Sequence, residues 1–447
     1  MKIRFYNSLS KKVEQFIPIK PGKVSMYVCG PTVYNYPHIG NMRPVIVFDT
    51  LRRFFEYVGY EVTYVSNFTD VDDKIIKKAQ EKQKTEKEIT DYFIDQFKKT
   101  TRSLGSKDPN ITPKVTEYVP EIISYIENLI EIDAAYLKNG NVYFRVDKIS
   151  DYGALSGIKI EELESGARVE TTDEKESPLD FALWKKTDEG LAWDSPWGKG
   201  RPGWHTECTV MIDSIFPSDG KIDIHGGGYD LKFPHHENEI AQSEACHHNK
   251  IANYWIHNNF INLNNEKMSK SLGNVIYAKD LIEQFSGNVV RMVILSTHYR
   301  SPVNFTNETI EAAKKEIQKI ENVYRQLTLS LQISDVLLPL KGKADNMDKF
   351  LLALSDDLNI SNALMELFEV IKNTNQSLRQ NNPDIEQLKK LYLTLTDMLS
   401  ILGLDIDYVR LNENDKMLYN KYLEAKTNKD FDRSDELRKK LIEKKII

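Results

Sequence analysis

Two short segments, far apart in the chain, carry residues that could hold a nucleoside triphosphate. Residues 37–41 read Pro-His-Ile-Gly-Asn and fall just before a predicted helix. Helix N-termini bind anions through their free N–H groups and the helix dipole. His38 can donate a hydrogen bond to a phosphate oxygen, and Gly40 lets a base or a ribose approach the backbone. The first segment therefore predicts a nucleotide-binding turn at the start of a helix.

The second segment supplies positive charge. Residues 267–271 read Lys-Met-Ser-Lys-Ser, a small and polar run that could move. Lys267 and Lys270 can neutralise charge on pyrophosphate as it leaves. Taken singly, His38 could be a satisfied loop histidine and the lysines could be solvated. The presence of both segments in one chain favours an ATP site.

A second group of side chains has the character of metal ligands. Two cysteines, a histidine and a glutamate belong to it: Cys29, Cys208, His235 and Glu239. His235 and Glu239 are four residues apart, so both could face one way from a helix. Thiolate, imidazole and carboxylate groups are the usual ligands of zinc. Two alternatives to this ligand set stay open. Single cysteines are mostly core residues, and His236 with Glu237 could replace His235 with Glu239.

The predicted elements place these residues around a parallel sheet. Residues 23–29 form a short apolar strand, 43–58 have helical spacing, and 62–65 form the next strand. Such a βαβ unit is typical of a doubly wound α/β fold. Residues 222–225 resume the sheet, and the glycines at 226–228 could touch a nucleotide or simply form a turn.

The rest of the chain is predicted as helices around one insertion. A charged helix covers roughly 72–102. Residues 139–195 contain short β-like pieces and many glycines, which indicates an insertion between the halves of the sheet. From about 308 to 447 almost everything has helical periodicity, with turn signals near 340, 380 and 403–413.

Length and composition set outer limits on the class of protein. At 447 residues, two to four domains are expected. Three cysteines are too few for a disulfide framework and fit a reducing cytoplasm. The sequence predicts neither a membrane span nor a secretory signal at its N-terminus. The net charge of −6 gives no whole-chain sign of nucleic-acid binding, although such a footprint can be local.

The two nucleotide segments together resemble the paired signatures of the class I aminoacyl-tRNA synthetases, and their surroundings resemble the cysteinyl-tRNA synthetases. The matching stretches are Tyr-Val-Cys-Gly-Pro-Thr-Val-Tyr at 27–34, Trp-His-Thr-Glu-Cys at 204–208 and His-His-Glu-Asn-Glu at 235–239. The resemblance implies catalytic and ATP-binding roles for four residues besides Gly40: His38, Asn41, Lys267 and Lys270. The family usually has histidine where this chain has Asn41, which puts extra charge stabilisation at that position in doubt.

The resemblance also implies a zinc site and a pocket for cysteine. One zinc per chain would be held by Cys29, Cys208, His235 and Glu239. Cys246 lies outside this set and is expected to be structural. The substrate would be held by Gly30, Thr69, Trp204 and His225. A thiolate is a far better zinc ligand than a serine hydroxyl, so the metal could select cysteine where packing alone could not.

The resemblance divides the chain into functional regions. The catalytic domain would comprise residues 1–115 and 196–260, with a connective domain inserted at 116–195. A stem-contact region would follow at 261–320, and a helical anticodon-binding domain at 321–447. The implied fold is a Rossmann-like α/β catalytic domain with an insertion, followed by an all-α C-terminal bundle.

The implied activity is the ATP-dependent activation of cysteine and its transfer to the 3′ end of tRNA(Cys) by a monomer, with magnesium accompanying ATP. One alternative is a cysteine ligase of mycothiol synthesis, and the helical C-terminal third argues against it. Another is a non-catalytic zinc- and tRNA-binding paralogue, and the intact Lys267 and Lys270 argue against that. Related chains usually continue beyond the point matching Ile447 into a short tail for anticodon recognition. The sequence therefore makes no prediction about anticodon discrimination.

Overall fold

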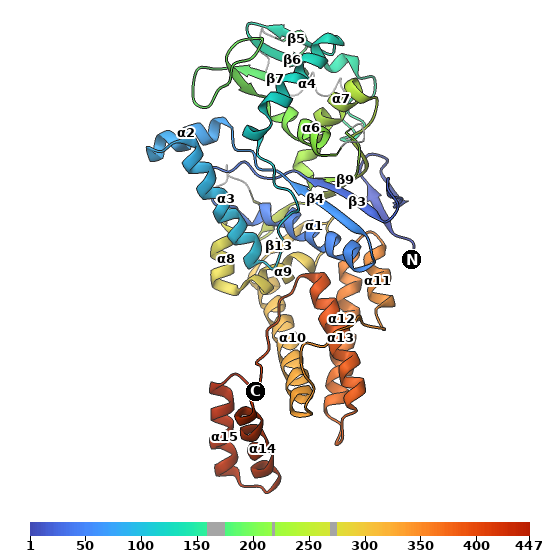
Figure 1. Cartoon of the computed structure of the whole chain (residues 1–447), viewed down its shortest axis with the longest axis vertical. Coiled ribbons are helices and arrows are strands. Elements are labelled where there is room, and N and C mark those ends of the chain that lie inside the picture. The colour runs from blue at the N-terminus through green and yellow to red at the C-terminus, as the bar shows by residue number, and fades with distance from the viewer. Residues whose placement is uncertain (159–174, 217–219, 269–274) are drawn as a thin grey trace. The chain divides into compact units, whose positions relative to one another are not determined.

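The structure is a computed structural model of the chain, and it describes residues 1–158, 175–216, 220–268 and 275–447 (Figure 1). The side chain of Lys267 and the whole of Lys270 lie outside the described part. Two compact units are present. The first comprises Met1–Gln284, Tyr299–Phe305 and Ser355–Leu358, and the second comprises Phe285–His298, Thr306–Leu354 and Asn359–Ile447.

A four-stranded parallel sheet is the centre of the first unit. Its strand order is β10-β9-β3-β4, with bounds Ala252–Asn258, Ile222–Gly228, Lys23–Val28 and Glu61–Ser66. Helix α1 (Ile39–Tyr57) connects β3 to β4, and α6 (Trp204–Ile215) and α7 (His235–His247) lie on the other side of the sheet (Figure 1). Strands covered on both faces read as apolar runs, as β3 does. The predicted doubly wound sheet is confirmed.

Helix α1 begins at Ile39, four residues before the predicted start near Arg43. His38 is its N-cap in an extended conformation, and the Asn41 side-chain oxygen accepts a hydrogen bond from the His38 backbone N–H at 3.1 Å. This capping contact starts the helix early and leaves Pro44 inside it, where the missing N–H removes one helical hydrogen bond. Gly40 and Asn41 therefore belong to the first turn of the helix.

Residues 72–102, predicted as one charged helix, form two helices. Helix α2 spans Asp73–Lys82 and α3 spans Glu86–Ser103. Gln83 ends α2 in the left-handed region with a φ of 53°, and the Thr85 side chain begins α3 as its N-cap. The capping hydrogen bonds of Thr85 outweigh the helical propensity of the residues between the two helices.

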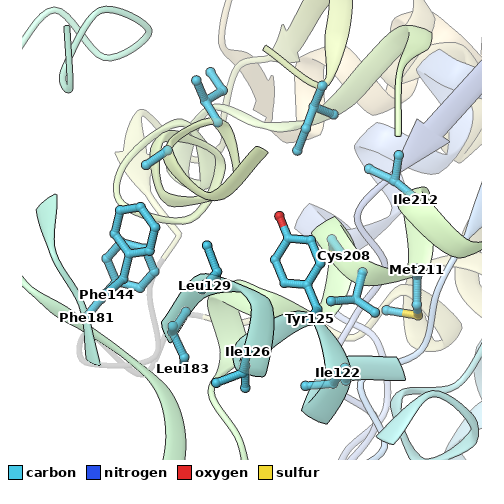
Figure 2. Close-up of a cluster of buried hydrophobic side chains, with 14 of the residues drawn as sticks. Ile122, Tyr125, Ile126, Leu129, Phe144, Phe181, Leu183, Cys208, Met211 and Ile212 are labelled. Atoms are coloured by element: carbon cyan, nitrogen blue, oxygen red, sulfur yellow. The ribbon is translucent and has the colours of Figure 1, made fainter. Parts of the chain in front are cut away.

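An antiparallel sheet lies between the two halves of the parallel sheet, where β-like pieces were predicted, but it extends beyond the predicted range 139–195 at both ends, with β5 and β8 outside it. Its strands β5 to β8 are Ala135–Lys138, Asn141–Phe144, Phe181–Lys186 and Gly200–Pro202. Figure 2 shows the cluster that packs helix α4 (Val119–Glu131) against this sheet and against α6. The rings of Phe144 and Phe181 stack 5.0 Å apart, and Met211 of α6 belongs to the same cluster. One core therefore joins the insertion to the helix that carries Cys208.

Shorter elements complete the first unit. Strands β1 and β2 form an N-terminal hairpin, and β12, β11 and β13 form a small sheet, with bounds Arg4–Asn7, Lys12–Gln15, Glu266–Lys267, Ile261–Leu263 and Val303–Phe305. Three 3-10 turns lie at Val115–Glu117, Val146–Lys148 and Tyr229–Lys232. Helix α8 (Ala278–Phe285) follows shortly after the undescribed segment 269–274.

The second unit is built from helices. The bounds of α9 to α15 are Gly287–Leu295, Asn307–Ile333, Asp348–Ser355, Ile360–Leu378, Ile385–Leu402, Glu413–Thr427 and Phe431–Glu443. The breaks near 340, 380 and 403–413 fall where turn signals predict them. Gly403 ends α13 with a φ of 67°, and a Cβ there would meet the Arg291 guanidinium at 2.3 Å. In the described part of the chain, every helix is too short or too polar to cross a membrane.

Candidate metal and nucleotide sites

Helix α6 holds Cys208 in a fixed place because its first turn is locked to the insertion. Gly203, the N-cap, donates its N–H to the Leu183 carbonyl at 2.7 Å. A Cβ on Gly203 would lie 2.0 Å from the Ala182 carbonyl oxygen, so this close approach requires glycine. The Cys208 side chain is buried and belongs to the cluster of Figure 2.

Three elements bring the four predicted metal ligands together. Cys29 directly follows β3, and Cys208 lies on α6, with their Sγ atoms 3.5 Å apart. His235 and Glu239 lie one turn apart on α7, and His235 Nε2 is 2.8 Å from Glu239 Oε1. Cys29 Sγ lies 3.6 Å from the same carboxylate oxygen. Ligand atoms of all four residues lie within 4.8 Å of one another.

The donor set fits zinc. Zinc binds sulfur at about 2.3 Å, which places two sulfurs of a tetrahedral site about 3.8 Å apart. The 3.5 Å separation of Cys29 and Cys208 is close to that value. Two thiols, one imidazole and one carboxylate also match the ligand types that zinc prefers.

A second group of donors overlaps with the first. His225 and His236 also lie within 4.8 Å of Cys29 and Glu239. His225 Nε2 is 2.5 Å from Glu239 Oε2, and His236 Nε2 is 3.2 Å from Cys29 Sγ. Both groups are geometrically possible. The group with Cys208 has two thiols, which favours it for zinc.

Glu237, the other carboxylate considered from the sequence, points elsewhere. Its two oxygens accept hydrogen bonds from the backbone N–H groups of Leu155 and Ser156, at 3.2 and 2.8 Å. The structure therefore does not bring His236 and Glu237 together as a pair of ligands.

The charges in the cluster suit a divalent cation. Burial, together with Cys208 and Glu239, raises the pKa of Cys29 well above its ordinary value. Burial opposes ionisation of Cys208 too, but hydrogen bonds with Cys29 and His235 outweigh it and lower the Cys208 pKa to about 6. Burial likewise opposes protonation of His235, but Glu239 and Cys208 outweigh it and raise the His235 pKa to about 10. A bound metal ion would displace the protons from Cys29 and His235.

Neighbouring rings fix His235 on its other side. His235 Nδ1 lies 3.1 Å from Nδ1 of His205, and burial lowers the pKa of His205 to about 3. The Trp204 ring stacks on the His235 ring with centroids 4.4 Å apart. Metal-binding histidines usually hold their second ring nitrogen in such a contact, which fixes the ring orientation.

A row of buried side chains runs from Cys29 into the protein. His236 Nε2 faces Cys29 Sγ, and His236 Nδ1 is 2.8 Å from Nε2 of His257. His257 Nδ1 is in turn 2.9 Å from the Ser8 hydroxyl. Burial lowers the pKa of His257 to about 3, so this ring is neutral at pH 7. His236, the first member of this row, therefore contacts the Cys29 thiol from the protein interior.

Two of the four residues predicted to bind cysteine lie directly against the metal ligands. Trp204 is 42% exposed and covers the outer face of His235. His225 is fully buried, stacks on Trp255 at 4.6 Å and contacts Glu239. His225 Nδ1 has no hydrogen-bond partner among the described residues.

Gly30 and Thr69 use some of their polar atoms within the protein. The Gly30 N–H donates to Asn67 Oδ1 at 2.8 Å, and a Cβ at Gly30 would lie 1.6 Å from the Asn67 backbone oxygen. The Thr69 hydroxyl donates to Glu207 at 2.7 Å, which leaves its oxygen able to accept. The sequence analysis assigned no role to Asn67 or Glu207, although Glu207 stands inside the stretch Trp-His-Thr-Glu-Cys at 204–208.

The predicted nucleotide segments meet next to α1. The Ile39 N–H donates to the Ile276 carbonyl at 3.0 Å, and the Ala278 N–H donates to the Pro37 carbonyl at 3.0 Å. On the other side of the undescribed residues, the Met268 side chain reaches to 2.9 Å from where a Cβ on Gly40 would lie. Described residues on both sides of positions 269–274 therefore lie against residues 37–40.

The environment of His38 suits a neutral hydrogen-bond donor. Burial lowers the His38 pKa, and Asp230 opposes this only in part. Its ring nitrogen Nδ1 has no hydrogen-bond partner among the described residues. The three glycines at 226–228 are the last residues of β9 and form no turn, and a Cβ on Gly226 would lie 2.1 Å from the Phe48 ring of α1.

Comparison with known proteins places the chain among the class I aminoacyl-tRNA synthetases, as the parallel sheet and the predicted nucleotide segments indicated. The family model for the tRNA synthetases class I (C) catalytic domain matches residues 15–315, and the DALR domain model matches residues 349–407. Methionyl-tRNA synthetase from Mycobacterium tuberculosis, in complex with methionyl-adenylate, has a TM-score of 0.60 at 14% identity. That alignment covers 85% of this chain and 89% of the other.

Relatives narrow the class to one family. Cysteine–tRNA ligases from Anoxybacillus flavithermus and Halalkalibacterium halodurans are each 46% identical to this chain over 454 aligned residues. Both alignments cover 100% of this chain and 97% of the relative. This chain belongs to the cysteine–tRNA ligase family.

Proposed function

We propose that this chain activates cysteine with ATP and transfers the cysteinyl group to the 3′ end of tRNA(Cys). One observation carries the proposal: Cys29 of the two-thiol cluster, at the end of β3, stands ten residues before the start of α1, and the segment between them joins the two candidate sites. An amino acid at the first site and a triphosphate at the second would have their reacting groups side by side.

In the first step, a carboxylate oxygen of cysteine bonds to the α-phosphorus of ATP. The bond from that phosphorus to the bridging oxygen breaks, and pyrophosphate leaves with the electron pair. The protein supplies no nucleophile, so its task is to position the substrates and stabilise charge. His38 would donate from its neutral ring to a phosphate oxygen, and Lys267 and Lys270 would offset the charge on pyrophosphate.

Asn41 has a defined part in this arrangement. Its side-chain oxygen accepts from the His38 N–H, so its amide nitrogen is the atom left to donate to a phosphate. An amide donates without carrying charge. We therefore propose that Asn41 supports ATP binding and contributes less to the transition state than a charged histidine would.

The amino-acid pocket would be built around zinc held by Cys29, Cys208, His235 and Glu239. Bound there, zinc would accept a thiolate but hold a serine hydroxyl only weakly, which distinguishes two nearly isosteric substrates. The oxygen of Thr69 can accept a hydrogen bond from the substrate ammonium group. Trp204 would close one side of the pocket, His225 would lie beneath it, and Gly30 would leave room for the substrate main chain.

In the second step, a hydroxyl oxygen of the terminal ribose bonds to the carbonyl carbon of cysteine. The bond from that carbon to the phosphate oxygen breaks, and AMP leaves with the electron pair while its phosphate takes up the hydroxyl proton.

We also propose magnesium as the companion of ATP, a monomeric state and a cytoplasmic location, the last because all three cysteines are unpaired. Catalysis would be carried out by residues 1–115 and 196–260, with residues 116–195 as the connective domain. Stem contact would belong to residues 261–320, and anticodon binding to residues 321–447.

Two assays on the full-length chain test the proposed reaction. Cysteine-dependent exchange of label between pyrophosphate and ATP should be observed, followed by transfer of labelled cysteine to a tRNA(Cys) transcript. Exchange followed by transfer to glucosaminyl-inositol, and not to tRNA, would instead identify the mycothiol-pathway ligase. Binding of tRNA without any exchange would identify a non-catalytic paralogue.

A further inference from the structure

Aromatic side chains gather on the segment that joins the two candidate sites. This segment runs from Gly30 to His38 and carries Tyr34 and Tyr36 at its centre. Its backbone is held on the sheet side by the Val33 N–H, which donates to the Thr69 carbonyl at 3.2 Å. The tyrosines are therefore fixed between the place proposed for the amino acid and the place proposed for the triphosphate.

Four side chains from three parts of the chain form what is called here the tyrosine–lysine cluster: Tyr36, Tyr92, Tyr277 and Lys279. The ring of Tyr36 lies 6.1 Å from that of Tyr92, on α3, and 6.1 Å from that of Tyr277. The Tyr36 and Tyr92 hydroxyl oxygens are 2.5 Å apart. The Tyr277 hydroxyl accepts a hydrogen bond from the Asn35 amide at 3.0 Å. The three rings thus hold one another in place.

A positive charge sits directly on this aromatic surface. The Lys279 ammonium lies 4.2 Å from the centroid of the Tyr36 ring, within the range of a cation–π contact. The Lys279 side chain is 45% exposed, and Asp280 Oδ1 lies 3.6 Å from its ammonium group. Tyr92 is 46% exposed, so its ring is accessible from solvent. Ring and charge are both presented to solvent.

The same pairing of ring and lysine recurs two residues earlier. The Lys74 ammonium of α2 lies 5.9 Å from the centroid of the Tyr34 ring. Tyr34 and Tyr36 are both half-buried and pack against the core under α2 and α3. Two aromatic rings on one short segment are therefore each accompanied by a lysine from a neighbouring helix.

We propose that the tyrosine–lysine cluster binds the single-stranded nucleotides at the 3′ end of the tRNA during transfer. Exposed aromatic rings stack with bases, and lysines neutralise the phosphates between them, which is the usual chemistry of single-stranded nucleic-acid sites. A peptide or a free nucleotide would not need several rings beside two lysines. This inference rests on the proposed function, since it names residues that would guide its second substrate.

The position of the cluster supports this choice of ligand. Tyr277 pairs through its backbone with His38 in an isolated bridge, so the cluster begins at the edge of the proposed ATP site. The accepting hydroxyl of the tRNA must reach the bond between cysteine and the α-phosphate. A strand that stacks on Tyr36 and Tyr92 would approach that bond along the Gly30–His38 segment.

Two exposed residues allow the proposal to be tested without disturbing the chemistry of activation. Replacing Tyr92 by alanine should lower kcat/KM for tRNA in aminoacylation by about 10-fold, because one base loses its stacking partner. Tyr92→Phe keeps the ring and should stay within about 2-fold of the wild type. Lys279→Ala should raise KM for tRNA and reduce the slope of log affinity against log salt by about 0.7, and Lys279→Arg should restore both.

A fluorescent base reports the contact directly. A tRNA with 2-aminopurine near its 3′ end should be quenched by the wild type and by Tyr92→Phe, and much less by Tyr92→Ala. Equal quenching by all three proteins, or an unchanged kcat/KM for tRNA in Tyr92→Ala and Lys279→Ala, would overturn the proposal. Cysteine-dependent exchange measured in every variant separates this outcome from failure of the proposed function, which would abolish exchange in the wild type as well.

Discussion

At the residue scale, the metal assignment depends on which thiols face the cluster. Cys29 and Cys208 have their sulfurs 3.5 Å apart, whereas Cys246 Sγ accepts a hydrogen bond from the Asn128 amide. Cys208→Ser should therefore lose the bound zinc, and Cys246→Ser should retain about one zinc per chain. Elemental analysis after dialysis against a weak chelator measures both. Loss of zinc in Cys246→Ser, or its retention in Cys208→Ser, would contradict the ligand set.

Lys270 provides a second test at this scale. The described residues on either side of it, Met268 and Ile276, lie against residues 37–40, so the lysine is expected to act on the triphosphate. Lys270→Ala should slow adenylate formation by about 10²–10³, because the contact acts on charge that develops as pyrophosphate leaves. Cysteine binding should change far less. Rapid-quench experiments measure the rate of adenylate formation. A rate near that of the wild type would contradict the proposed role of Lys270.

The sequence alone could not choose between neighbouring histidines. His235 and His236 are one residue apart, which is about 100° around a helix, and Glu237 and Glu239 are two residues apart. The choice depends on which face of α7 meets Cys208. In the structure that face carries His235, while Glu237 is occupied by the backbone of Leu155 and Ser156. Spacing predicted the type of site, and tertiary packing excluded Glu237, while the second thiol, Cys208, favours the group with His235 over the group with His236.

At the scale of elements, one buried carboxylate ties several segments of the first unit together. Asp357 Oδ1 accepts from the Tyr6 N–H at 2.9 Å and from the Tyr299 hydroxyl at 2.5 Å, and Oδ2 accepts from Arg300 Nε at 2.8 Å. Asp357→Asn removes the charge and an acceptor while keeping the shape. The free energy of unfolding of this unit should fall by about 2 kcal/mol.

The neighbouring residue Asp356 is a matched control. Its ion pair with Arg4 is formed by side chains that are both 52% exposed, and exposed pairs contribute only about 0–1 kcal/mol. All five tryptophans lie in the first unit, so thermal unfolding followed by tryptophan fluorescence reports on that unit. Asp357→Asn should lower the midpoint clearly and Asp356→Asn should not. Equal shifts would mean that Asp357 has no special role.

Local signals predicted most elements, and capping explains where they failed. The strands of the parallel sheet and the turns of the helical unit follow from periodicity and from glycine positions. The start of α1 was placed too late because the contact between His38 and Asn41 joins a backbone group to a side chain, which apolar spacing does not record. The break between α2 and α3 depends on the Thr85 cap in the same way.

At the scale of the whole molecule, the predicted fold class held because the βαβ unit is read over a short stretch of sequence. The members of the candidate site could not be predicted from local sequence patterns in the same way. Its ligands come from β3, α6 and α7, which are separated by up to 210 residues between Cys29 and Glu239. Long-range proximity of this kind was reached only through resemblance to a family. The row from His236 through His257 to Ser8 was not predicted, because no local pattern links these residues.

The central claim is that this chain activates cysteine at a site where a metal selects the thiol. The most direct test is the ratio of kcat/KM for cysteine to kcat/KM for serine in ATP–pyrophosphate exchange by the zinc-loaded, full-length protein. Packing alone discriminates such close analogues by roughly 10²-fold. The account predicts a ratio larger than this by orders of magnitude, because serine leaves the metal without its additional ligand. A ratio of about 10² or less would contradict selection by the metal, and exchange that fails with cysteine would contradict the function itself.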